Sequence, residues 1–341
     1  MTGNATYELR DTAVLSVCAV EAPVVVTSEA FDERLMRSYE RTGLKPGMVE
    51  QLAGVRERHW WPEDVTFADA AAMAGAKALA EAGVDPSQVG LLINTSVCRD
   101  GIEPANAAGV HDLLGLETSC LNFDVTNACL GFLNGIQLAG SLIDAGQVEY
   151  ALLVDAEGLR GLQESTLTRL AQDDATAEDL KLQFATLTLG SGSAAMVLGR
   201  ASEHPEGHRV KGGVSRSGTQ HKDLCWADMT RMRTDSRALF EAGIELAGQT
   251  WHDALASGRE WADADWFIAH QTSVVHLKAL ADVIGVPIEQ VPMTVPTFGN
   301  LASAAVPFTL AKQVPMIKPG QKVMLLGIGS GLNTSFAEII W

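Results

Sequence analysis

The order of sequence features in the first half of the chain repeats in the second half, and this repeat limits the folds that the chain can adopt. In the first half, the apolar run at 91–97 leads to Asn127-Ala-Cys129 and a long apolar helix pattern. In the second half, the apolar run at 266–273 leads to Phe298-Gly-Asn300 and another helix pattern. Two copies of one βα unit would place the two helix N-termini opposite each other across a pseudo-two-fold axis. We therefore expect Cys129 and Asn300 to occupy equivalent places in one shared site.

Continuous apolar runs rich in β-branched residues predict buried strands, and segments with helical spacing lie between many of them. The expected strands are at 14–20, 89–93, 150–154, 194–198, 266–268, 323–326 and 335–340. The expected helices are at 67–82, 130–145, 237–255, 275–284 and 301–314. This alternation predicts an α/β fold in which helices pack on sheets.

The polar segment at 201–208 is the best candidate for the boundary between the two halves. We therefore expect an N-terminal half at 1–205 that carries Cys129 and a C-terminal half at 206–341. The acidic segment at 158–183 interrupts the repeat and is interpreted as an insertion, whose leucines are expected to cover the site or a partner subunit.

The composition of the 341-residue chain excludes several classes of protein. With 47% hydrophobic and 20% charged residues it is typical of a soluble enzyme, and its net charge of -17 argues against a nucleic-acid partner. The five cysteines have neither CxxC nor metal-ligand spacing, which argues against a disulfide framework or a zinc site. Neither a secretory signal nor a stretch long enough to span a bilayer is present. We expect a cytoplasmic protein in a reducing compartment.

One segment departs from the acidic trend. Between Arg209 and Arg237 the chain has seven basic and three acidic residues, a net charge of +4. Two interpretations remain open: a solvated surface, or a patch in which Arg216, Arg231 and Arg233 bind phosphate groups.

Cys129 stands between an extended stretch and an apolar helix pattern, which suggests a nucleophile because a helix N-terminus favours the thiolate and lowers its pKa. The alternative is a small core residue. His270 and Asn300, taken singly, are each more typical of a polar residue near a strand end. Together with Cys129 they form a Cys, His, Asn set in equivalent chain positions, in which His and Asn donate hydrogen bonds to a thioester carbonyl.

An acyl group held as a thioester on Cys129 also needs donors for the oxyanion of each tetrahedral intermediate. We expect these to be the backbone N–H groups of Cys129 and of Ser330, within Gly327-Ile-Gly-Ser-Gly-Leu332. This glycine-rich string runs into a strand and opens no helix, so it is not a dinucleotide-binding loop.

These residues resemble the thiolase superfamily, and within it the ketoacyl synthase III-like condensing enzymes, over essentially the whole chain. The subgroup that is most similar joins two long-chain acyl-CoA molecules head to head. The motifs that carry the resemblance are Leu91-Leu-Ile-Asn-Thr-Ser-Val97, Arg99-Asp-Gly-Ile-Glu103-Pro104, Asn127-Ala-Cys129-Leu130, Lys211-Gly-Gly-Val214, His270-Gln271, Gly299-Asn300 and Leu326-Gly-Ile-Gly-Ser-Gly-Leu-Asn333. The chain departs from the pattern after Asn300, where Leu-Ala-Ser-Ala-Ala replaces a run with Gly and Pro, and this puts the pocket shape in doubt.

The resemblance implies a thiolase-like fold of two pseudo-symmetric βα halves in an αβαβα arrangement. It implies no metal and no cofactor other than the coenzyme A of the substrate. Glu103 matches a glutamate that, in the subgroup, reaches the site of the neighbouring subunit and removes an α-proton, which implies an obligate homodimer. Candidate partners are fatty acyl-CoA substrates and enzymes of the following pathway steps. The alternative for Glu103 is an exposed loop carboxylate before Pro104.

The leading hypothesis is a non-decarboxylative Claisen condensation of two fatty acyl-CoA molecules to a 2-alkyl-3-ketoacyl product. The first alternative is a decarboxylative 3-oxoacyl-ACP synthase III-type enzyme, whose malonyl extender loses CO2 and needs no base, so Glu103 decides between the two reactions. The strong acidity of this chain disfavours that alternative, because the carrier protein that such an enzyme binds is acidic. The second alternative is a non-catalytic partner subunit of such an enzyme.

Overall fold

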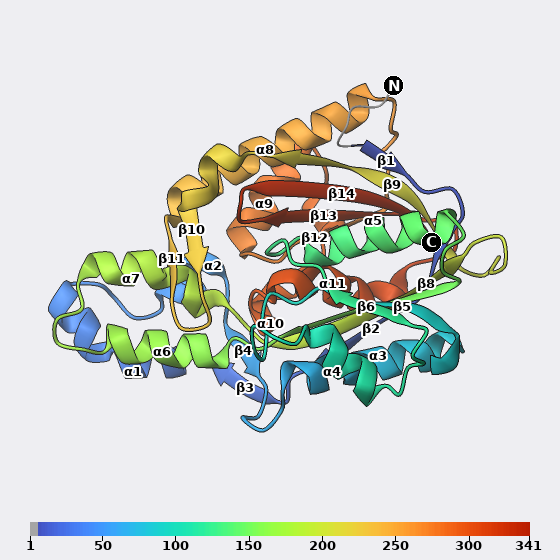
Figure 1. The fold of residues 1–341 in the computed structure, drawn as a ribbon. Helices are drawn as coiled ribbons and strands as arrows, with labels where there is room; N and C mark the ends of the chain where they lie inside the picture. Colours follow the sequence, from blue (N-terminus) through green and yellow to red (C-terminus); the bar gives the residue numbers. More distant parts are fainter. Residues whose placement is uncertain (1–5) are drawn as a thin grey trace.

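The computed structural model describes residues 6–341, which form a layered α/β protein (Figure 1). The strands are β1 (Thr6–Glu8), β2 (Thr12–Glu21), β3 (Val24–Thr27), β4 (Glu57–Trp60), β5 (Val89–Asn94), β6 (Leu121–Asp124), β7 (Tyr150–Glu157), β8 (Gly192–Arg200), β9 (His208–Ser217), β10 (Cys225–Ala227), β11 (Met232–Thr234), β12 (Trp266–Ala269), β13 (Lys322–Gly329) and β14 (Asn333–Ile340). The helices are α1 (Ser28–Thr42), α2 (Met48–Ala53), α3 (Phe67–Ala82), α4 (Asn106–Leu113), α5 (Gly131–Asp144), α6 (Arg160–Leu170), α7 (Ala177–Gln183), α8 (Ser236–Ala256), α9 (Val274–Ile284), α10 (Val295–Phe298) and α11 (Ala305–Gln313).

The central sheet is built twice from one strand pattern. The order β2-β8-β7-β5 in the first half has the same sequence of directions as β9-β14-β13-β12 in the second: antiparallel, antiparallel, then parallel. The two sets are joined where Ala13 and Val14 of β2 pair with Arg209 and His208 of β9. β6 continues the first set as its outermost strand and pairs in parallel with β5. The duplication expected from the sequence is therefore present in the sheet.

The two strand sets of this sheet lie in separate layers, so that five layers stack in the order helices, strands, helices, strands, helices (Figure 1). α3 packs on β2, β7 and β8 on one outer face, and α8 packs on β9 and β14 on the other. α5 and α11 lie in the middle layer, where α5 contacts β7 and β14 and α11 contacts β2 and β12. β7 is buried along its whole length, which accounts for its continuous apolar run. The α/β class and the thiolase-like layering expected from the sequence are confirmed.

Local sequence signals explain the helix ends that we predicted best. α3 begins after Thr66, whose hydroxyl accepts from the Asp69 backbone N–H while the Asp69 carboxylate accepts from Thr66, and it ends at Gly83 in a left-handed conformation. The helix expected at 301–314 is shorter, because Ala302–Ala304 form a 3-10 turn and α11 begins at Ala305.

The division into halves at 205/206 stays a prediction, and that position lies in the turn between β8 and β9.

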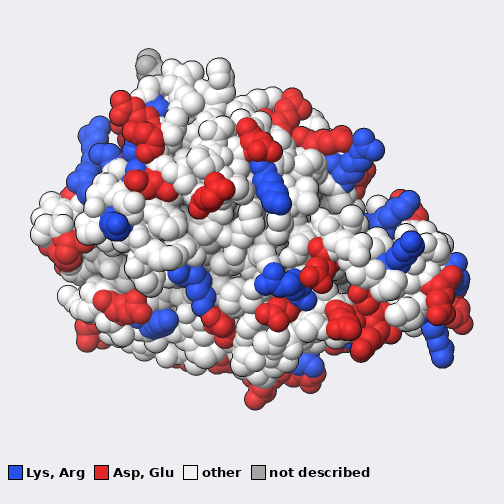
Figure 2. All heavy atoms as spheres, turned by 180° about the vertical axis from the view of Figure 1, so that it is seen from behind, with Lys and Arg blue, Asp and Glu red and all other residues white. Residues whose placement is uncertain are grey.

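A side region flanks the layered body, and it contains α1, α2, α6, α7 and two two-stranded sheets, β3–β4 and the hairpin β10–β11 (Figure 1). The segment that we interpreted as an insertion forms α6 and α7, which contact α1 and β11 respectively. Figure 2 shows basic side chains interspersed among acidic ones over the face seen from behind. None of the helices in residues 6–341 is long and apolar enough to cross a membrane.

Candidate active site

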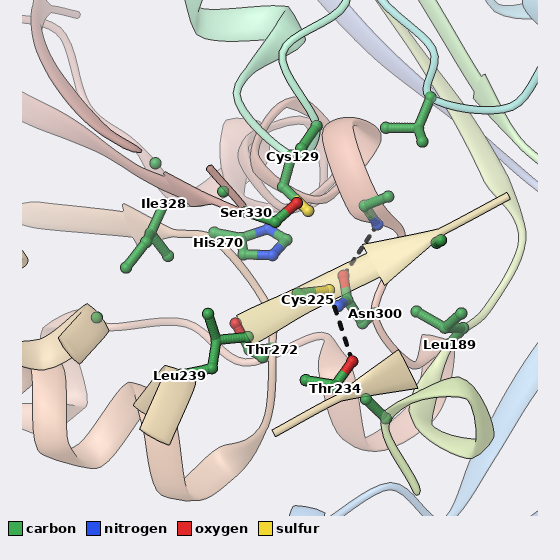
Figure 3. A pocket seen from close by; sticks show the side chains of 18 of the residues that line it. Cys129, Leu189, Cys225, Thr234, Leu239, His270, Thr272, Asn300, Ile328 and Ser330 are labelled. Carbon is green, nitrogen blue, oxygen red and sulfur yellow. Dashed lines mark hydrogen bonds between the residues drawn. The ribbon is translucent and has the colours of Figure 1, made fainter. Parts of the chain in front are cut away.

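One cavity of about 600 Å³ brings together residues from both halves (Figure 3). Its walls include Cys129, His270, Asn300 and Ser330, which the sequence places up to about 200 positions apart. Leu159 and other apolar side chains form most of the remaining wall: Leu162, Leu189, Met229, Met232, Leu239, Ile244, Leu277, Leu280, Ile328, Leu332 and Phe336. Such a cavity has the size and the mostly apolar lining of a small-molecule site.

Cys129 lies in the turn between β6 and α5, two residues before the first residue of the helix. The preceding Ala128 has a left-handed φ of 46°, which is uncommon for a residue with a side chain and is typical of functional turns. Ala302 has a similar φ of 43°, and both residues lie three positions before α5 or α11 begins. Ser303 stands two residues before α11, as Cys129 stands two residues before α5, so Ser303 is the positional counterpart of Cys129. Asn300 lies in the corresponding turn but three residues earlier.

Asn300 is fixed by its backbone and by one side-chain oxygen. Its N–H donates to the Thr188 carbonyl at 2.9 Å, and its Oδ1 accepts from the Ala302 N–H at 2.9 Å. Gly299 has φ +70°, and a Cβ there would lie 2.8 Å from the Thr188 oxygen, so a larger residue would push this turn away. The amide nitrogen of Asn300 is left as the donor available to a ligand in the cavity.

His270 follows β12 directly, and its backbone N–H donates to the Leu326 carbonyl at 2.8 Å. The neighbouring Gln271 is fully buried and bonds to the Ala269 and Pro292 carbonyls and to the N–H groups of Thr294 and Val295. This glutamine therefore holds the end of β12 against the segment before α10. Figure 3 shows the His270 imidazole pointing toward Cys129 and Asn300.

The end of β13 passes close to the nucleophile turn. A Cβ at Gly329 would lie 3.2 Å from the Cys129 nitrogen and 3.4 Å from the Asn127 oxygen. The absence of a side chain at Gly329 thus lets the strand approach the Cys129 N–H, and Ser330 is the next residue. Ser330 lies beside Cys129 in Figure 3.

Burial changes the ionisation of both candidate catalytic side chains. Desolvation, followed by the negative charge of Glu157, raises the pKa of the Cys129 thiol well above its usual range. Desolvation and the nearby His276 lower the pKa of His270 to about 4. The sequence-based expectation of a lowered pKa at Cys129 was wrong, because burial and Glu157 outweigh the helix N-terminus. In the unliganded protein at neutral pH the pair is a neutral thiol and a neutral imidazole.

This assignment predicts the pH dependence of Cys129 alkylation. Since the thiolate reacts and the thiol pKa is raised, the rate of alkylation by iodoacetamide should keep rising from about pH 6 to about pH 9. Peptide mass spectrometry of the Cys129 peptide gives the rate. A plateau that begins below about pH 7 would contradict a raised pKa.

Four predicted site residues do not line this cavity in the single chain. Glu103 lies in the exposed loop before α4. Arg216 is on β9 and pairs with Asp253 at 2.7 Å. Arg231 and Arg233 are exposed on the β10–β11 hairpin, next to the cavity-lining residues Met229 and Met232.

Sequence reasoning missed several polar groups at the site. Arg99, Cys98, Cys225 and His276 all line the cavity. Glu157, at the end of β7, is fully buried and accepts hydrogen bonds from backbone N–H groups behind the nucleophile. The available signal was an acidic pair, Asp155 and Glu157, inside a run with the apolar character of a strand buried on both faces. Within residues 6–341, no group of three or more His, Cys, Asp or Glu is arranged to hold a metal ion.

Comparisons with known proteins point to the same class. Residues 123–213 match the family model of 3-oxoacyl-[acyl-carrier-protein] synthase III, and residues 255–341 match the model of its C-terminal part. The acyl-CoA:acyl-CoA alkyltransferase of Xanthomonas campestris pv. campestris is 40% identical over 97% of this chain and 99% of that protein. The acyl-CoA:acyl-CoA alkyltransferase of Shewanella oneidensis is 34% identical over 94% of this chain and 96% of that protein.

Solved structures of OleA have the same fold as this chain. A crystal structure of OleA from Xanthomonas campestris, in which a cysteine is replaced by alanine, superposes with a TM-score of 0.96 at 39% identity over 98% of both chains. A cysteine-to-serine variant of the same protein, with bound lauric acid and lauroyl-CoA, gives a TM-score of 0.95 over 98% of this chain and 100% of that one. Other variants of that OleA replace a histidine or a glutamate.

The fold and the site define a thiolase-fold condensing enzyme of the ketoacyl synthase III type. Within that class, the chain belongs to the family of acyl-CoA:acyl-CoA alkyltransferases, the OleA family.

Proposed function

We propose that this protein catalyses the non-decarboxylative Claisen condensation of two fatty acyl-CoA molecules to a 2-alkyl-3-ketoacyl thioester or the derived β-keto acid. The observation that carries the proposal is the convergence of Cys129, His270 and Asn300 on one largely apolar cavity of about 600 Å³. Apolar walls suit alkyl chains, and the polar groups are confined to the place where the thioester reacts. Relatives named as acyl-CoA:acyl-CoA alkyltransferases support the substrate class.

The first half-reaction is acyl transfer to Cys129. The Cys129 sulfur attacks the thioester carbonyl, its proton passes to neutral His270, and the proton then leaves with the CoA thiolate as CoA-SH. A pKa near 4 keeps the His270 imidazole neutral and able to accept that proton. The N–H groups of Cys129 and Ser330 stabilise the oxyanion.

The second half-reaction needs a carbanion on the second acyl-CoA. We propose that Glu103 removes the α-proton, while His270 and the Asn300 amide bind the thioester oxygen on which charge develops. The carbanion then attacks the acyl carbon on Cys129, a carbon–carbon bond forms, and the Cys129 thiolate is expelled. The bond between the acyl carbon and sulfur is the one that breaks, and no CO2 is released.

Glu103 is proposed to act in the cavity of a second copy of the chain. Its loop is exposed in the single chain, and the adjacent Ile102 has 93% of its surface exposed. Near this loop, β6 is the end strand of the central sheet, and its Leu121 is 54% exposed. An exposed apolar edge strand is a ready surface for pairing with another chain. These features support a homodimer in which each subunit supplies Glu103 to the other.

The phosphates of CoA are proposed to bind beside the β10–β11 hairpin, where Arg231 and Arg233 are exposed. Replacement of both by alanine should raise the KM for acyl-CoA about tenfold, and added salt should weaken the wild type in the same direction. Arg216→Ala is the matched control with a smaller effect, because Arg216 already pairs with Asp253. An unchanged KM in the double variant would favour the interpretation of this segment as a solvated surface.

The direct test of the proposed chemistry is intact mass spectrometry after incubation with acyl-CoA of different chain lengths. We expect the mass of one acyl group to be added to the protein, and a condensed product to form with acyl-CoA as the only substrate. A decarboxylative 3-oxoacyl-ACP synthase III-type enzyme would release CO2 from a malonyl thioester, and a non-catalytic subunit would not become acylated. We also propose a cytoplasmic location, since a reducing compartment preserves the five free cysteines.

A further inference from the structure

Two buried carboxyl groups lie behind the nucleophile and take no part in the proposed chemistry. Asp155 and Glu157, on the last part of β7, are both fully buried. Glu157 accepts hydrogen bonds from the backbone N–H groups of Val97 at 3.0 Å, Cys98 at 3.1 Å and Ser303 at 3.3 Å. Asp155 accepts from the Thr95 hydroxyl at 2.6 Å, and its second oxygen has no partner among the described residues. The cost of burying two carboxyl groups needs an explanation.

The three N–H groups on Glu157 come from both halves of the chain. Val97 and Cys98 follow β5 in the first half, whereas Ser303 lies between Asn300 and α11 in the second. The Ser303 hydroxyl oxygen in turn accepts the Phe132 N–H at 3.0 Å, in the first turn of α5. A continuous chain of hydrogen bonds therefore runs from Glu157 through Ser303 to the helix that follows Cys129.

We infer that Glu157 is a positioning residue for the nucleophile, and that its carboxylate ties the turn of Cys129 to the turn of Asn300 and holds a negative charge behind Cys129. The inference rests on the proposed role of Cys129. It goes beyond that role because it assigns a function to a residue that does not line the cavity.

The hydrogen bonds decide which carboxyl carries the charge. Burial raises the pKa of Glu157, but the donors from Val97, Cys98 and Ser303 oppose this rise. Burial and the Glu157 charge together raise the pKa of Asp155 well above its usual value. As the pH falls, Asp155 therefore takes up a proton more readily than Glu157, which favours the negative charge of the pair on Glu157. The titratable groups that face Cys129 are then Glu157, Asp155 and Cys225, together with His270 across the cavity.

Glu157→Gln should separate two rates that a purely structural role would move together. Loss of the charge lowers the pKa of Cys129, so alkylation of Cys129 by iodoacetamide at about pH 8 should become roughly tenfold faster. The glutamine NH2 cannot accept a backbone N–H, so the positioning is impaired and acyl transfer from acyl-CoA should become slower. Peptide mass spectrometry measures alkylation, and intact mass measures acyl transfer.

Asp155→Asn is the matched control, since a protonated Asp155 has no charge to lose and alkylation of Cys129 should change less than about twofold. Alkylation of Glu157→Gln at or below the wild-type rate would overturn the inference. If Glu157→Gln does not fold, Ser303→Ala tests the positioning, with slower acyl transfer and unchanged alkylation expected. Unchanged acyl transfer in Ser303→Ala would then overturn it. Because alkylation needs neither acyl transfer nor condensation, the alkylation outcomes are independent of whether the proposed overall reaction is correct.

Discussion

Cys129→Ser is expected to lose both acylation and condensation, by at least about a thousandfold in rate. A serine hydroxyl in the same turn has a far higher pKa than a thiol, and no stronger base than neutral His270 lies in the cavity to activate it. Intact mass after incubation with acyl-CoA gives the acylation, and product mass gives the condensation.

Cys120→Ser is the control for this experiment, because Cys120 is a buried thiol in a separate core cluster that does not line the cavity. It should become acylated like the wild type. An acyl group that still adds to Cys129→Ser at the wild-type rate would show that the nucleophile is another residue.

Glu103→Ala should separate acylation from condensation. Acylation needs only Cys129, His270 and the oxyanion donors, so the acyl-enzyme should still form. Removal of an α-proton from an unactivated acyl-CoA needs a base, so condensation should fall by at least about a hundredfold. Glu289→Ala, which removes an exposed carboxylate that does not line the cavity, should retain both steps. Full condensation by Glu103→Ala would move the assignment to the decarboxylative alternative.

The subunit that supplies Glu103 can be determined by complementation. Inactive Cys129→Ala and inactive Glu103→Ala, mixed under conditions of subunit exchange, should form heterodimers that contain one complete site. Activity should then return in part. Absence of activity after exchange has been demonstrated would favour a base that acts within its own chain.

The fold could be predicted from the sequence where burial is continuous. Strands such as β7 are covered on both faces by helices, so their sequences are continuous apolar runs. The start and end of α3 are indicated by the capping residue Thr66 and by Gly83. β9 was not predicted as a strand, because Lys211, Gly212 and Gly213 interrupt its apolar pattern although the strand joins the two halves of the sheet. α1 was missed because only one face of it is buried and charged residues fill the rest.

The sequence identified the candidate catalytic residues of the site, but it did not show how they are buried or what surrounds them. Cys129 and His270 were identifiable because each stands between a strand and a helix, and Asn300 because it lies in the turn before the helix pattern of α11. Their environment depends on contacts between the halves, which no local pattern records. Burial and Glu157 reverse the expected shift in the pKa of Cys129, and the only sequence signal for the burial of Glu157 was its place at the end of an apolar strand pattern.

The central claim is that two acyl-CoA molecules are joined without loss of CO2. The most direct test supplies purified protein with one acyl-CoA, labelled with ¹³C at the thioester carbon, as the only substrate. The account predicts release of CoA and a condensed product that contains both alkyl chains and both labelled carbons. The product has to be analysed before any derived β-keto acid decomposes. No condensed product from acyl-CoA alone, together with a product and CO2 once a malonyl thioester is added, would contradict it.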